Sequence, residues 1–348
     1  MQPRRFTRIL VRATNWVGDA VMSLPALHAI RERFPEAHIA VLARPWVADI
    51  YAREKFADEV MLYDLPRGWR DPAGKWRLAQ QLRARRFDCA ILLQNAFEAA
   101  ALVWLAGIPQ RIGYDRDGRG WLLTRAVEVP RWGEIPRHQQ FYYLEMLRRA
   151  DLLERLPETD TIRLGGATQA AAAGRERFRA LGCEGPVVGV SPGAAYGTAK
   201  CWLPERFAEA AEETAGSLDA AVALFGSADE KALCVEIESA LTSRGRVVFN
   251  LAGETRLGEF IELCAACRVF LTNDSGAMHI ASALGVPTVA VFGATDHVAT
   301  GPTGPLARVV REPVECSPCL LRECPIDHRC MTRVPAQRVA LAALELVK

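Results

Sequence analysis

The chain has 348 residues, half of them hydrophobic and 24% charged, with a formal net charge of +2. This length favours two domains, and so small a net charge argues against a nucleic-acid partner. No apolar run reaches the roughly 18 residues that a membrane span needs, and the first residues lack the apolar segment of a signal peptide. We therefore expect a cytoplasmic protein, peripheral on a membrane at most, whose ten cysteines are mostly reduced.

The first half of the chain alternates short apolar runs with helical patterns. The runs predict strands at 8–12, 38–43, 59–63, 89–93, 111–114 and 126–129. The helical patterns lie at 19–34, 46–53, 75–85, 97–106 and 138–149. Such alternation predicts βαβ units and a parallel sheet with helices on both faces.

The same pattern restarts after a turn-rich stretch near residues 155–170. Strands are predicted at 187–191, 220–225, 247–251, 269–272 and 288–292. Helices are predicted at 165–181, 205–214, 229–241, 257–267, 277–284 and 335–347. The fold class is therefore α/β, with two Rossmann-like, doubly wound domains at 1–160 and 161–334 facing a cleft. The last segment, 335–348, is expected to pack back on the N-terminal domain. Ligands of such sheets bind beyond the carboxyl ends of the strands.

The stretch from Leu271 to Leu284 is the most informative turn. It predicts a buried strand, a short polar turn and a helix of small residues, which together present free backbone N–H groups and a positive helix end to an anion. Asp274 in this turn suits ribose or sugar hydroxyls, and Gly276 lets the backbone approach a ligand. Capping of the helix by Asp274 or Ser275 explains the same residues equally well.

The turn after the first strand, at residues 14–19, lacks the GxGxxG pattern of dinucleotide-binding epimerases and dehydrogenases. Gly18 permits a tight bend there, and Asp19 stands near the start of the following helix. Asp19 is either an N-cap or a carboxylate that takes a proton from an attacking hydroxyl.

Three turns of the second half add candidate ligand contacts. Gly193 and Gly197 shape a loop that reaches Lys200, whose single ammonium suits a diphosphate, although a solvated lysine is the ordinary alternative. Gly226 and Ser227 would let a base or ribose approach. The turn at 250–255 offers backbone groups to an adenine edge.

Taken together, these turns resemble glycosyltransferase family 9, the ADP-heptose:lipopolysaccharide heptosyltransferases of Gram-negative bacteria. The resemblance is carried by Asn15–Leu27, Pro192–Ala194, Ala199–Trp202, Asn250–Gly253, Asn273–His279 and the tail Cys316–Pro325. It implies a GT-B fold, with the acceptor in the first domain and ADP-heptose in the second. It also implies an inverting transfer that requires no cofactor or metal.

The implied acceptor is heptosyl-Kdo-lipid A at the inner face of the inner membrane, which would receive L-glycero-D-manno-heptose on its first heptose. Transfer of a first heptose to Kdo-lipid A is the alternative. A non-catalytic nucleotide-sugar-binding protein would share the architecture, but it should be exported, and no signal segment is present.

Site residues follow from the resemblance. Asp19 matches the catalytic base, and Lys200 matches the lysine that binds the diphosphate. The predicted donor-binding residues are Gly193, Tyr196, Lys200, Gly226, Ser227, Gly253, Thr255, Asp274, Ser275, Gly276 and His279. Some relatives carry hydroxyl residues where this chain has Ala195 and Tyr196, which leaves the donor contacts of that loop open to backbone groups alone.

The implied acceptor is anionic, so arginines in loops of the first domain would suit it. These are Arg44, Arg67, Arg70, Arg111 and Arg119, each of which is more simply a solvated side chain when taken singly. Trp46, Trp69, Trp76 and Trp132 would form an aromatic edge against sugars or lipid headgroups, with core packing as the commoner alternative. The predicted acceptor-binding set is Asn15, Trp16, Gly18, Arg44 and Arg111.

Four cysteines near the end of the chain have the spacing of a zinc site. Cys316, Cys319, Cys324 and Cys330, with His328 beside them, offer the ligand types of a tetrahedral site. The resembled family is not known for needing a metal. We therefore predict no required metal, with a structural zinc at these cysteines as the alternative.

Overall fold

The structure is a computed structural model that describes residues 6–66, 68, 70–158 and 161–348. The chain forms two compact units, residues 1–160 and residues 161–348, which are called the N-terminal unit and the C-terminal unit below. Arg67 and Trp69, two residues singled out in the sequence, lie outside the described residues.

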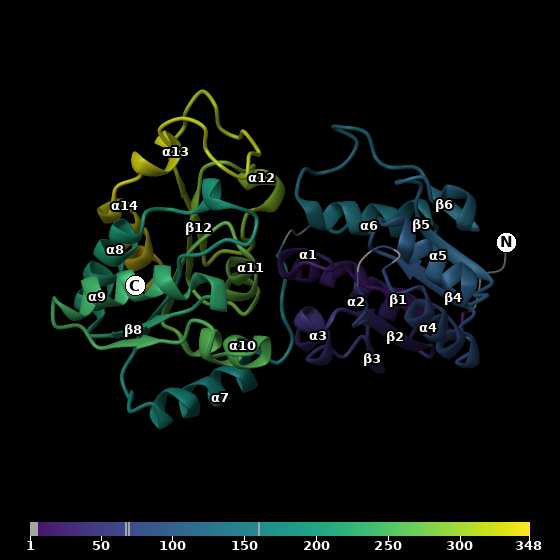
Figure 1. Cartoon of the computed structure of the whole chain (residues 1–348), viewed down its shortest axis with the longest axis horizontal. Coiled ribbons are helices and arrows are strands. Elements are labelled where there is room, and N and C mark those ends of the chain that lie inside the picture. The colour runs from purple at the N-terminus through teal and green to yellow at the C-terminus, as the bar shows by residue number, and fades with distance from the viewer. Residues whose placement is uncertain (1–5, 67, 69, 159–160) are drawn as a thin grey trace. The chain divides into compact units, whose positions relative to one another are not determined.

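The N-terminal unit is built on a six-stranded parallel sheet in the order β3-β2-β1-β4-β5-β6 (Figure 1). Its strands are β1 (Arg8–Arg12), β2 (His38–Ala43), β3 (Glu59–Leu62), β4 (Cys89–Leu92), β5 (Gln110–Tyr114) and β6 (Arg125–Val127). Because β1 pairs with β2 on one side and with β4 on the other, the strand order reverses at β1. The loops after β1 and β4 therefore separate there, at the position where such sheets bind ligands.

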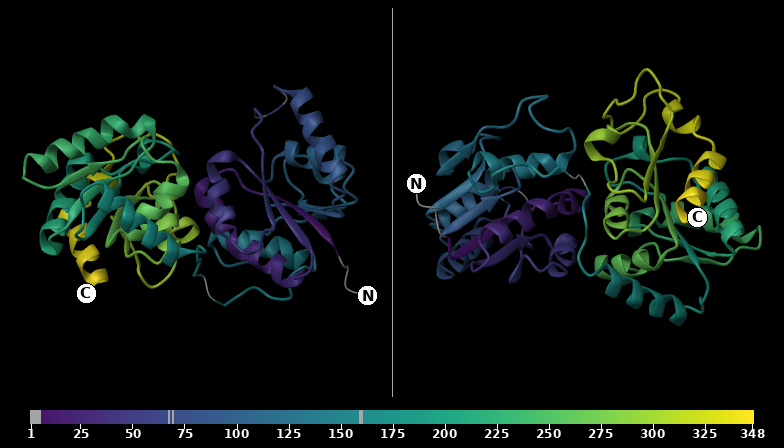
Figure 2. Two further views of the ribbon diagram at one scale, coloured as in Figure 1. Left: turned by 90° about the horizontal axis from the view of Figure 1, so that it is seen from below. Right: turned by 180° about the vertical axis from the view of Figure 1, so that it is seen from behind.

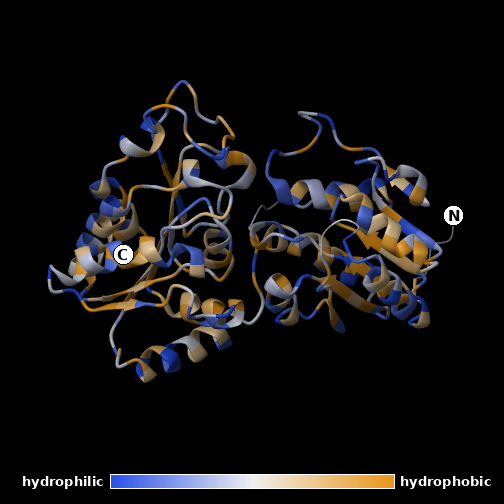
Figure 3. Cartoon of the chain, in the orientation of Figure 1, coloured by the Kyte–Doolittle hydropathy of each residue, from blue (hydrophilic) through white to orange (hydrophobic). Residues whose placement is uncertain are grey.

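Helices cover both faces of this sheet, as right-handed crossovers require. One face carries α1 (Val17–Met22), α2 (Leu24–Arg33), α3 (Pro45–Ala52) and α6 (Gln139–Arg149). The other face carries α4 (Pro72–Ala84), α5 (Phe97–Leu105) and the short 3₁₀ helix η1 (Gly120–Leu122) (Figure 2). The central strands are apolar along their length because both of their faces are buried, which Figure 3 shows by hydropathy.

The helix predicted at 19–34 is two helices in the structure. α1 ends at Met22, and α2 starts at Leu24 with Pro25 in its first turn. The Ser23 hydroxyl donates to the Ala20 carbonyl at 2.8 Å, which turns the chain between the two helices. Proline lacks the N–H that a continuous helix would use, so its place near a helix start explains the break.

The C-terminal unit repeats this plan with the order β12-β11-β10-β7-β8-β9. Its strands are β7 (Val187–Ser191), β8 (Ala221–Leu224), β9 (Val248–Asn250), β10 (Val269–Asn273), β11 (Thr288–Phe292) and β12 (Ala307–Arg311). The reversal falls between β7 and β10, so the loops after these two strands flank the ligand position of this sheet. The edge strand β12 was not predicted, because its sequence ARVVR alternates charged and apolar residues over only five positions.

Helices also cover both faces of the second sheet. Its longer helices are α7 (Ala167–Ala180), α8 (Pro204–Leu218), α9 (Lys231–Thr242), α10 (Leu257–Ala266), α11 (Gly276–Ala283) and α14 (Ala336–Val347). The short ones are η2 (Thr198–Lys200), η3 (Ala228–Glu230), α12 (His297–Thr300) and α13 (Arg329–Thr332). One hydrophobic core joins α8, α9 and α14 to the sheet, while α10 packs against both α7 and α11.

The final helix, α14, belongs to the C-terminal unit. Its apolar residues Val339, Ala340 and Ala343 are fully buried, and its neighbours are α8 and strands β10 to β12. Its apolar face is thus covered within the C-terminal unit, and the expected contact with the N-terminal domain stays a prediction. No helix in the described part of the chain is long and apolar enough to cross a membrane.

Candidate active site

Asp19 lies beside the strand reversal of the N-terminal sheet. Helix α1 begins after Trp16, so Asp19 is in its first turn and is not the N-cap residue. This differs from the capping interpretation of the sequence. The position, just beyond the carboxyl end of β1, suits a general base that meets a bound hydroxyl group.

Tyr143 of α6 holds this carboxylate. Its hydroxyl donates to Asp19 Oδ1 at 3.1 Å across 124 residues of sequence. Burial, and then the nearby Asp19 charge, raise the pKa of Tyr143 well above its usual range, so the phenol remains a proton donor. Asp19 is therefore fixed by a neutral hydrogen-bond donor from a different helix.

A cavity of about 370 Å³ opens at the same end of the sheet. It is lined by residues from the ends of β1, β2 and β4 and from one side of α5, which are Arg12, Asn15, Trp16, Arg44, Tyr63, Gly68, Gln94, Ala96, Glu98, Ala99 and Leu102. The predicted acceptor residues Asn15, Trp16 and Arg44 are thus brought together here. Gly18, the second residue of α1, lies in the adjoining turn.

Two arginines give this cavity its charge. The guanidinium carbons of Arg12 and Arg44 lie 4.7 and 4.2 Å from the centre of the Tyr63 ring. Arg12 also donates to Asn15 Oδ1 at 3.0 Å. Burial, and then the charge of Arg44, lower the pKa of Arg12 to about 9, so both side chains are cations near neutral pH.

Glu98 lines the same cavity and is paired with Lys75. Their side chains form an ion pair of 3.3 Å, and Glu98 accepts hydrogen bonds from the Tyr63 hydroxyl and from the Gly68 N–H. Burial raises the pKa of Glu98 and lowers that of Lys75. The cavity lining thus holds two arginines and one carboxylate that is itself paired with Lys75, so the cavity favours an anionic ligand.

The remaining predicted arginines have other roles. Arg111 lies near the start of β5, at the opposite end of the sheet, and its guanidinium donates to the carbonyls of Ile108 and Leu122 at 2.6 Å each. Arg119 is fully buried and donates to the Gln94 and Tyr114 carbonyls. Both hold backbone in place, which corrects the expected acceptor role of Arg111. Arg12 was not predicted as a site residue. The sequence signal that could have identified it is an arginine at the end of the apolar run Ile9–Val11.

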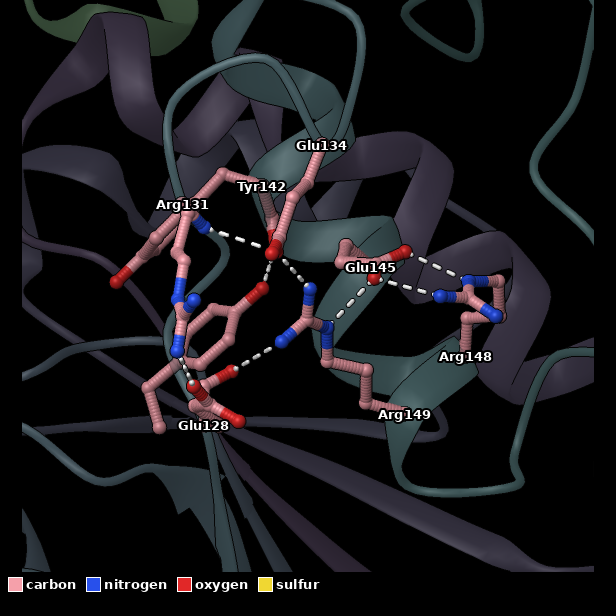
Figure 4. Close-up of polar contacts among 8 residues, drawn as sticks. Glu128, Arg131, Glu134, Tyr142, Glu145, Arg148 and Arg149 are labelled. Atoms are coloured by element: carbon pink, nitrogen blue, oxygen red, sulfur yellow. Dashed lines mark hydrogen bonds and ion pairs between the residues drawn. The ribbon is translucent and has the colours of Figure 1, made fainter.

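Ion pairs join the end of α6 to the loop before the helix. Glu145 is 1% exposed at its side chain and pairs with Arg148 and Arg149 at 2.7 and 2.6 Å (Figure 4). Arg149 also reaches Glu134, at 2.6 Å, in the preceding loop. The Arg149–Glu134 pair thus ties the loop before α6 to the last residue of the helix that carries Tyr143.

Lys200 and Asp274 meet at the strand reversal of the C-terminal sheet. Lys200 ends the loop after β7, Asp274 follows β10, and their side chains form an ion pair of 2.6 Å. Thr295, after β11, donates its hydroxyl to the same Asp274 oxygen at 2.6 Å. The Lys200 and Asp274 side chains are 14% and 5% exposed. Since an ammonium has three donors, this pair orients Lys200 and leaves donors for a ligand.

The start of α11 adds backbone N–H groups beside this ion pair. Ser275 is the N-cap and accepts from the Met278 N–H at 3.4 Å, so Ser275 and not Asp274 caps the helix. Gly276 is the first helical residue, while His279 is buried one turn further on. The helix end and Lys200 together form a positive site suited to phosphate.

Glycines allow the loops around this site to approach one another closely. A side chain at Gly193 would collide with the Glu230 carboxylate, which lies 1.8 Å from the position of the missing Cβ. Gly253 has a φ of +74° and donates to the Gly226 carbonyl at 2.9 Å. The Ser227 N–H and hydroxyl both donate to the Glu230 carboxylate, at 2.7 and 3.0 Å, so Ser227 caps the following helix here.

The cysteine segment at 316–330 packs on the lysine loop. The Ala199 N–H donates to the Arg322 carbonyl at 2.9 Å, and a ring nitrogen of His328 lies 3.1 Å from the Ala199 carbonyl. The Tyr196 hydroxyl donates to the Leu320 carbonyl at 2.9 Å, and the Tyr196 ring has Lys200 and Arg322 within 5.0 and 5.2 Å of its centre. Arg322 is thus a second cation near the site that the sequence did not reveal.

No metal site is formed by the part of the chain that the structure describes. There, no three His, Cys, Asp or Glu side chains are gathered in a way that would hold a metal ion. The described contacts of the cysteine segment are those with the lysine loop, and the structural zinc at its four cysteines stays an untested alternative.

A family model described as glycosyltransferase family 9 (heptosyltransferase) matches residues 75–329. This chain belongs to glycosyltransferase family 9. Lipopolysaccharide heptosyltransferase 2 of Escherichia coli K12 is 33% identical over 312 residues, which cover 87% of this chain and 88% of the relative. The protein of the same name from Salmonella typhimurium is 34% identical over the same coverage. The solved structure of E. coli ADP-heptose LPS heptosyltransferase II has a TM-score of 0.83 at 31% identity and covers 98% of both chains.

Family 9 membership confirms the family and the GT-B fold class predicted from the sequence turns. The protein is therefore a glycosyltransferase. The matched range includes the cavity-lining helix α5, Lys200 and the α11 turn, but it begins after Asp19. The identities with the two heptosyltransferase 2 sequences extend over most of both chains.

Proposed function

We propose that this protein transfers L-glycero-D-manno-heptose from ADP-heptose to the first heptose of the lipopolysaccharide inner core. The observation that carries the proposal is the complementary chemistry at the two strand reversals. A carboxylate, Asp19, stands at one of them, and a cation, Lys200, stands with a helix N-terminus at the other. A transfer that takes a proton from an alcohol and releases a nucleoside diphosphate needs both kinds of group.

The C-terminal unit would bind the donor. Lys200 and the N–H groups at the start of α11 face the diphosphate in this proposal, while Asp274 and Thr295 hold the ammonium in place. As the bond from the anomeric carbon to the phosphate oxygen breaks, the electron pair leaves with ADP. Fixed positive groups stabilise that growing charge more than they stabilise the bound donor, and this difference is what raises the rate.

The N-terminal unit would bind the acceptor. Asp19 accepts the proton of the acceptor hydroxyl as its oxygen bonds to the anomeric carbon, on the face opposite the leaving ADP, so the configuration inverts. The cavity lined by Arg12 and Arg44 would take an anionic group of the acceptor, either a Kdo carboxylate or a phosphate. Their guanidinium groups suit both, since each presents planar paired donors to oxygen atoms.

The proposed reaction uses no metal ion, because Lys200 and the α11 N-terminus meet the diphosphate charge. Protein dialysed against EDTA should therefore keep its rate. A loss that Mg²⁺ or Zn²⁺ restores would contradict this part of the proposal.

The choice of acceptor is supported by the relatives named heptosyltransferase 2. Transfer to Kdo-lipid A remains the competing proposal because the cationic cavity would serve both anionic acceptors. The acceptor is lipid-anchored in either case, so the protein would work at the inner face of the inner membrane as a peripheral protein.

The decisive experiment measures ADP release from ADP-heptose with two acceptors, one bearing no heptose and one bearing a single heptose. The proposal expects release with the second acceptor and little with the first. The reverse preference would assign the protein to the first heptose addition. Release with neither acceptor, in protein that binds ADP, would overturn the proposed acceptor class.

A further inference from the structure

Tryptophan is distributed very unevenly between the two units. Seven of the eight tryptophans fall in residues 1–160. The six that the structure describes there are each 46–85% exposed, whereas Trp202 of the C-terminal unit is 1% exposed. Tryptophan is usually well buried, so its repeated exposure on one unit indicates a surface that contacts something else.

Helix α5 shows where one such surface lies. Its sequence, FEAAALVWL, contains one charged residue, Glu98, and is otherwise apolar around the whole helix. A helix with no polar face is normally covered on all sides. Here Ala100 and Val103 are buried against the sheet, yet Trp104 remains 48% exposed. The outer side of α5 therefore lacks the polar residues that water would favour.

Three aromatic side chains join on this outer side. The Trp121 ring of η1 lies 6.2 Å from the Phe97 ring and 6.5 Å from the Trp104 ring, measured between centroids. Trp121 itself is 71% exposed. Phe97 and Trp104 are seven residues apart, two turns along one side of α5. These residues are called the α5 aromatic cluster below.

Two arginines flank the α5 aromatic cluster. Arg83 donates to the Leu105 carbonyl at 3.2 Å, next to Trp104, and Arg111 donates to the Leu122 carbonyl at 2.6 Å, next to Trp121. The N-terminal unit is also the basic half of the protein. Residues 1–160 hold 25 Lys and Arg against 20 Asp and Glu, a net charge of +5, while residues 161–348 hold 18 against 21, a net charge of −3.

The cluster and the cationic cavity use opposite sides of the same helix. Glu98, Ala99 and Leu102 line the cavity, while Phe97 and Trp104 point toward Trp121. An α-helix is about 10 Å across with its side chains. A surface bound to the α5 aromatic cluster would thus lie about one helix diameter from the sugar-binding end of the sheet.

We propose that the α5 aromatic cluster is a membrane-contact surface that enters the headgroup layer of an anionic bilayer. The inference builds on the proposed function, since a lipid-anchored acceptor reaches the cavity most readily from a bilayer held beside α5. Tryptophan suits this layer because its ring is apolar and its N–H is polar. The flanking arginines and the net positive charge of the unit match anionic lipid headgroups.

The test is co-sedimentation of the full chain with vesicles of phosphatidylcholine alone, or of phosphatidylcholine and phosphatidylglycerol in a roughly 2:1 ratio. Wild-type protein should sediment with the anionic vesicles and much less with the neutral ones. The double variant Trp104→Ser/Trp121→Ser should bind the anionic vesicles more weakly by on the order of tenfold. Trp132→Ser is the matched control, because Trp132 is 85% exposed and stacks with Arg137 on a different loop. It should bind as the wild type does.

Several outcomes would overturn the proposal. These are absence of wild-type binding to anionic vesicles, equal binding to neutral ones, an unchanged double variant, or an equal loss in Trp132→Ser. A wild-type dimer in sedimentation without lipid, lost in the double variant, would assign the cluster to a second copy of the chain instead.

Transfer to a deacylated, water-soluble acceptor separates this inference from the proposed function. The double variant should retain that activity, which also shows that it is folded. If the wild type binds anionic vesicles but transfers no heptose, the proposed function fails while the membrane surface stands. If the wild type transfers heptose but does not bind vesicles, the membrane surface is wrong while the proposed function stands.

Discussion

The two units of this protein share one strand order, but they carry different charged side chains at the strand reversal. In the N-terminal unit, Asp19 is held by the neutral phenol of Tyr143, and the nearby cavity is lined by Arg12 and Arg44 with the carboxylate of Glu98. In the C-terminal unit, a single ammonium is held by one carboxylate at 2.6 Å. In the proposed function, the first arrangement keeps Asp19 able to accept a proton, and the second keeps Lys200 directed at the diphosphate.

This difference shows how one architecture supports two chemical tasks. The sheet supplies only a place where two loops separate, so the chemistry depends on which side chains those loops carry and on what holds them. The predictions below separate the two tasks by measuring turnover and ADP binding independently.

The largest expected effect is from Asp19→Asn. Loss of the base should lower kcat by about 10²–10⁴-fold, while calorimetry should show unchanged ADP affinity because the donor residues lie in the other unit. Near-normal turnover in a folded variant would remove Asp19 from the catalytic role.

The next effect is from Lys200→Ala, which should lower both ADP affinity and kcat, the latter by about 10²–10³-fold. It should also lower the melting temperature, because Asp274, 5% exposed at its side chain, would lose its ionic partner. Lys231→Ala is the matched control, since its ion pair with Glu254 is 57% and 60% exposed and should contribute little to stability. Unchanged ADP affinity in Lys200→Ala would exclude the diphosphate role.

The comparison also shows what the sequence determined. Strand positions, the Asp19 turn and the Asp274 turn were predictable because each depends on a short local pattern of apolar, glycine and polar residues. Tyr143, Thr295 and Arg322 were not, since each reaches the site from a distant segment through the fold. The predicted acceptor role of Arg111 has a similar difficulty. The sequence next to a loop does not show at which end of the sheet an arginine lies.

Burial was another source of error. Trp76 and Trp132 were more simply read as core residues, yet they are 52% and 85% exposed. Arg119, read as a solvated or cleft residue, is fully buried and donates to carbonyls at strand ends. Composition predicts burial only on average, so single tryptophans and arginines can depart from it.

A smaller kinetic effect is expected from Tyr143→Phe. The lost hydrogen bond favoured the ionised carboxylate, so the acid limb of the kcat profile should move to higher pH, with kcat lower by less than about tenfold at its optimum. Tyr142→Phe is the control, because its hydroxyl meets Asn95 at 2.9 Å and not Asp19. A profile that keeps its shape while only the melting temperature falls would reduce Tyr143 to a structural contact.

The last prediction concerns stability at alkaline pH and leaves turnover at neutral pH unchanged. Burial raises the pKa of Cys234 in the C-terminal unit to about 12, and that of Tyr51 in the N-terminal unit also to about 12. In the unfolded chain, these groups lose their protons near pH 8.5 and 10, respectively. The folded state therefore retains protons that the unfolded state has released, and the free energy of unfolding falls as the pH rises through this window.

Urea unfolding under reducing conditions, repeated between about pH 8 and 12, should show this decline beginning near pH 9. Cys234→Ala should make the decline shallower from about pH 9 upward, because it removes one of several buried thiols whose pKa is raised. Tyr51→Phe should flatten only the upper part, by up to about 3 kcal/mol. Each variant can also change stability at every pH through packing, so the slope against pH is the measurement that matters. Equal slopes in all three proteins would mean that neither Cys234 nor Tyr51 governs alkaline stability. The loss of stability would then arise from other titrating groups.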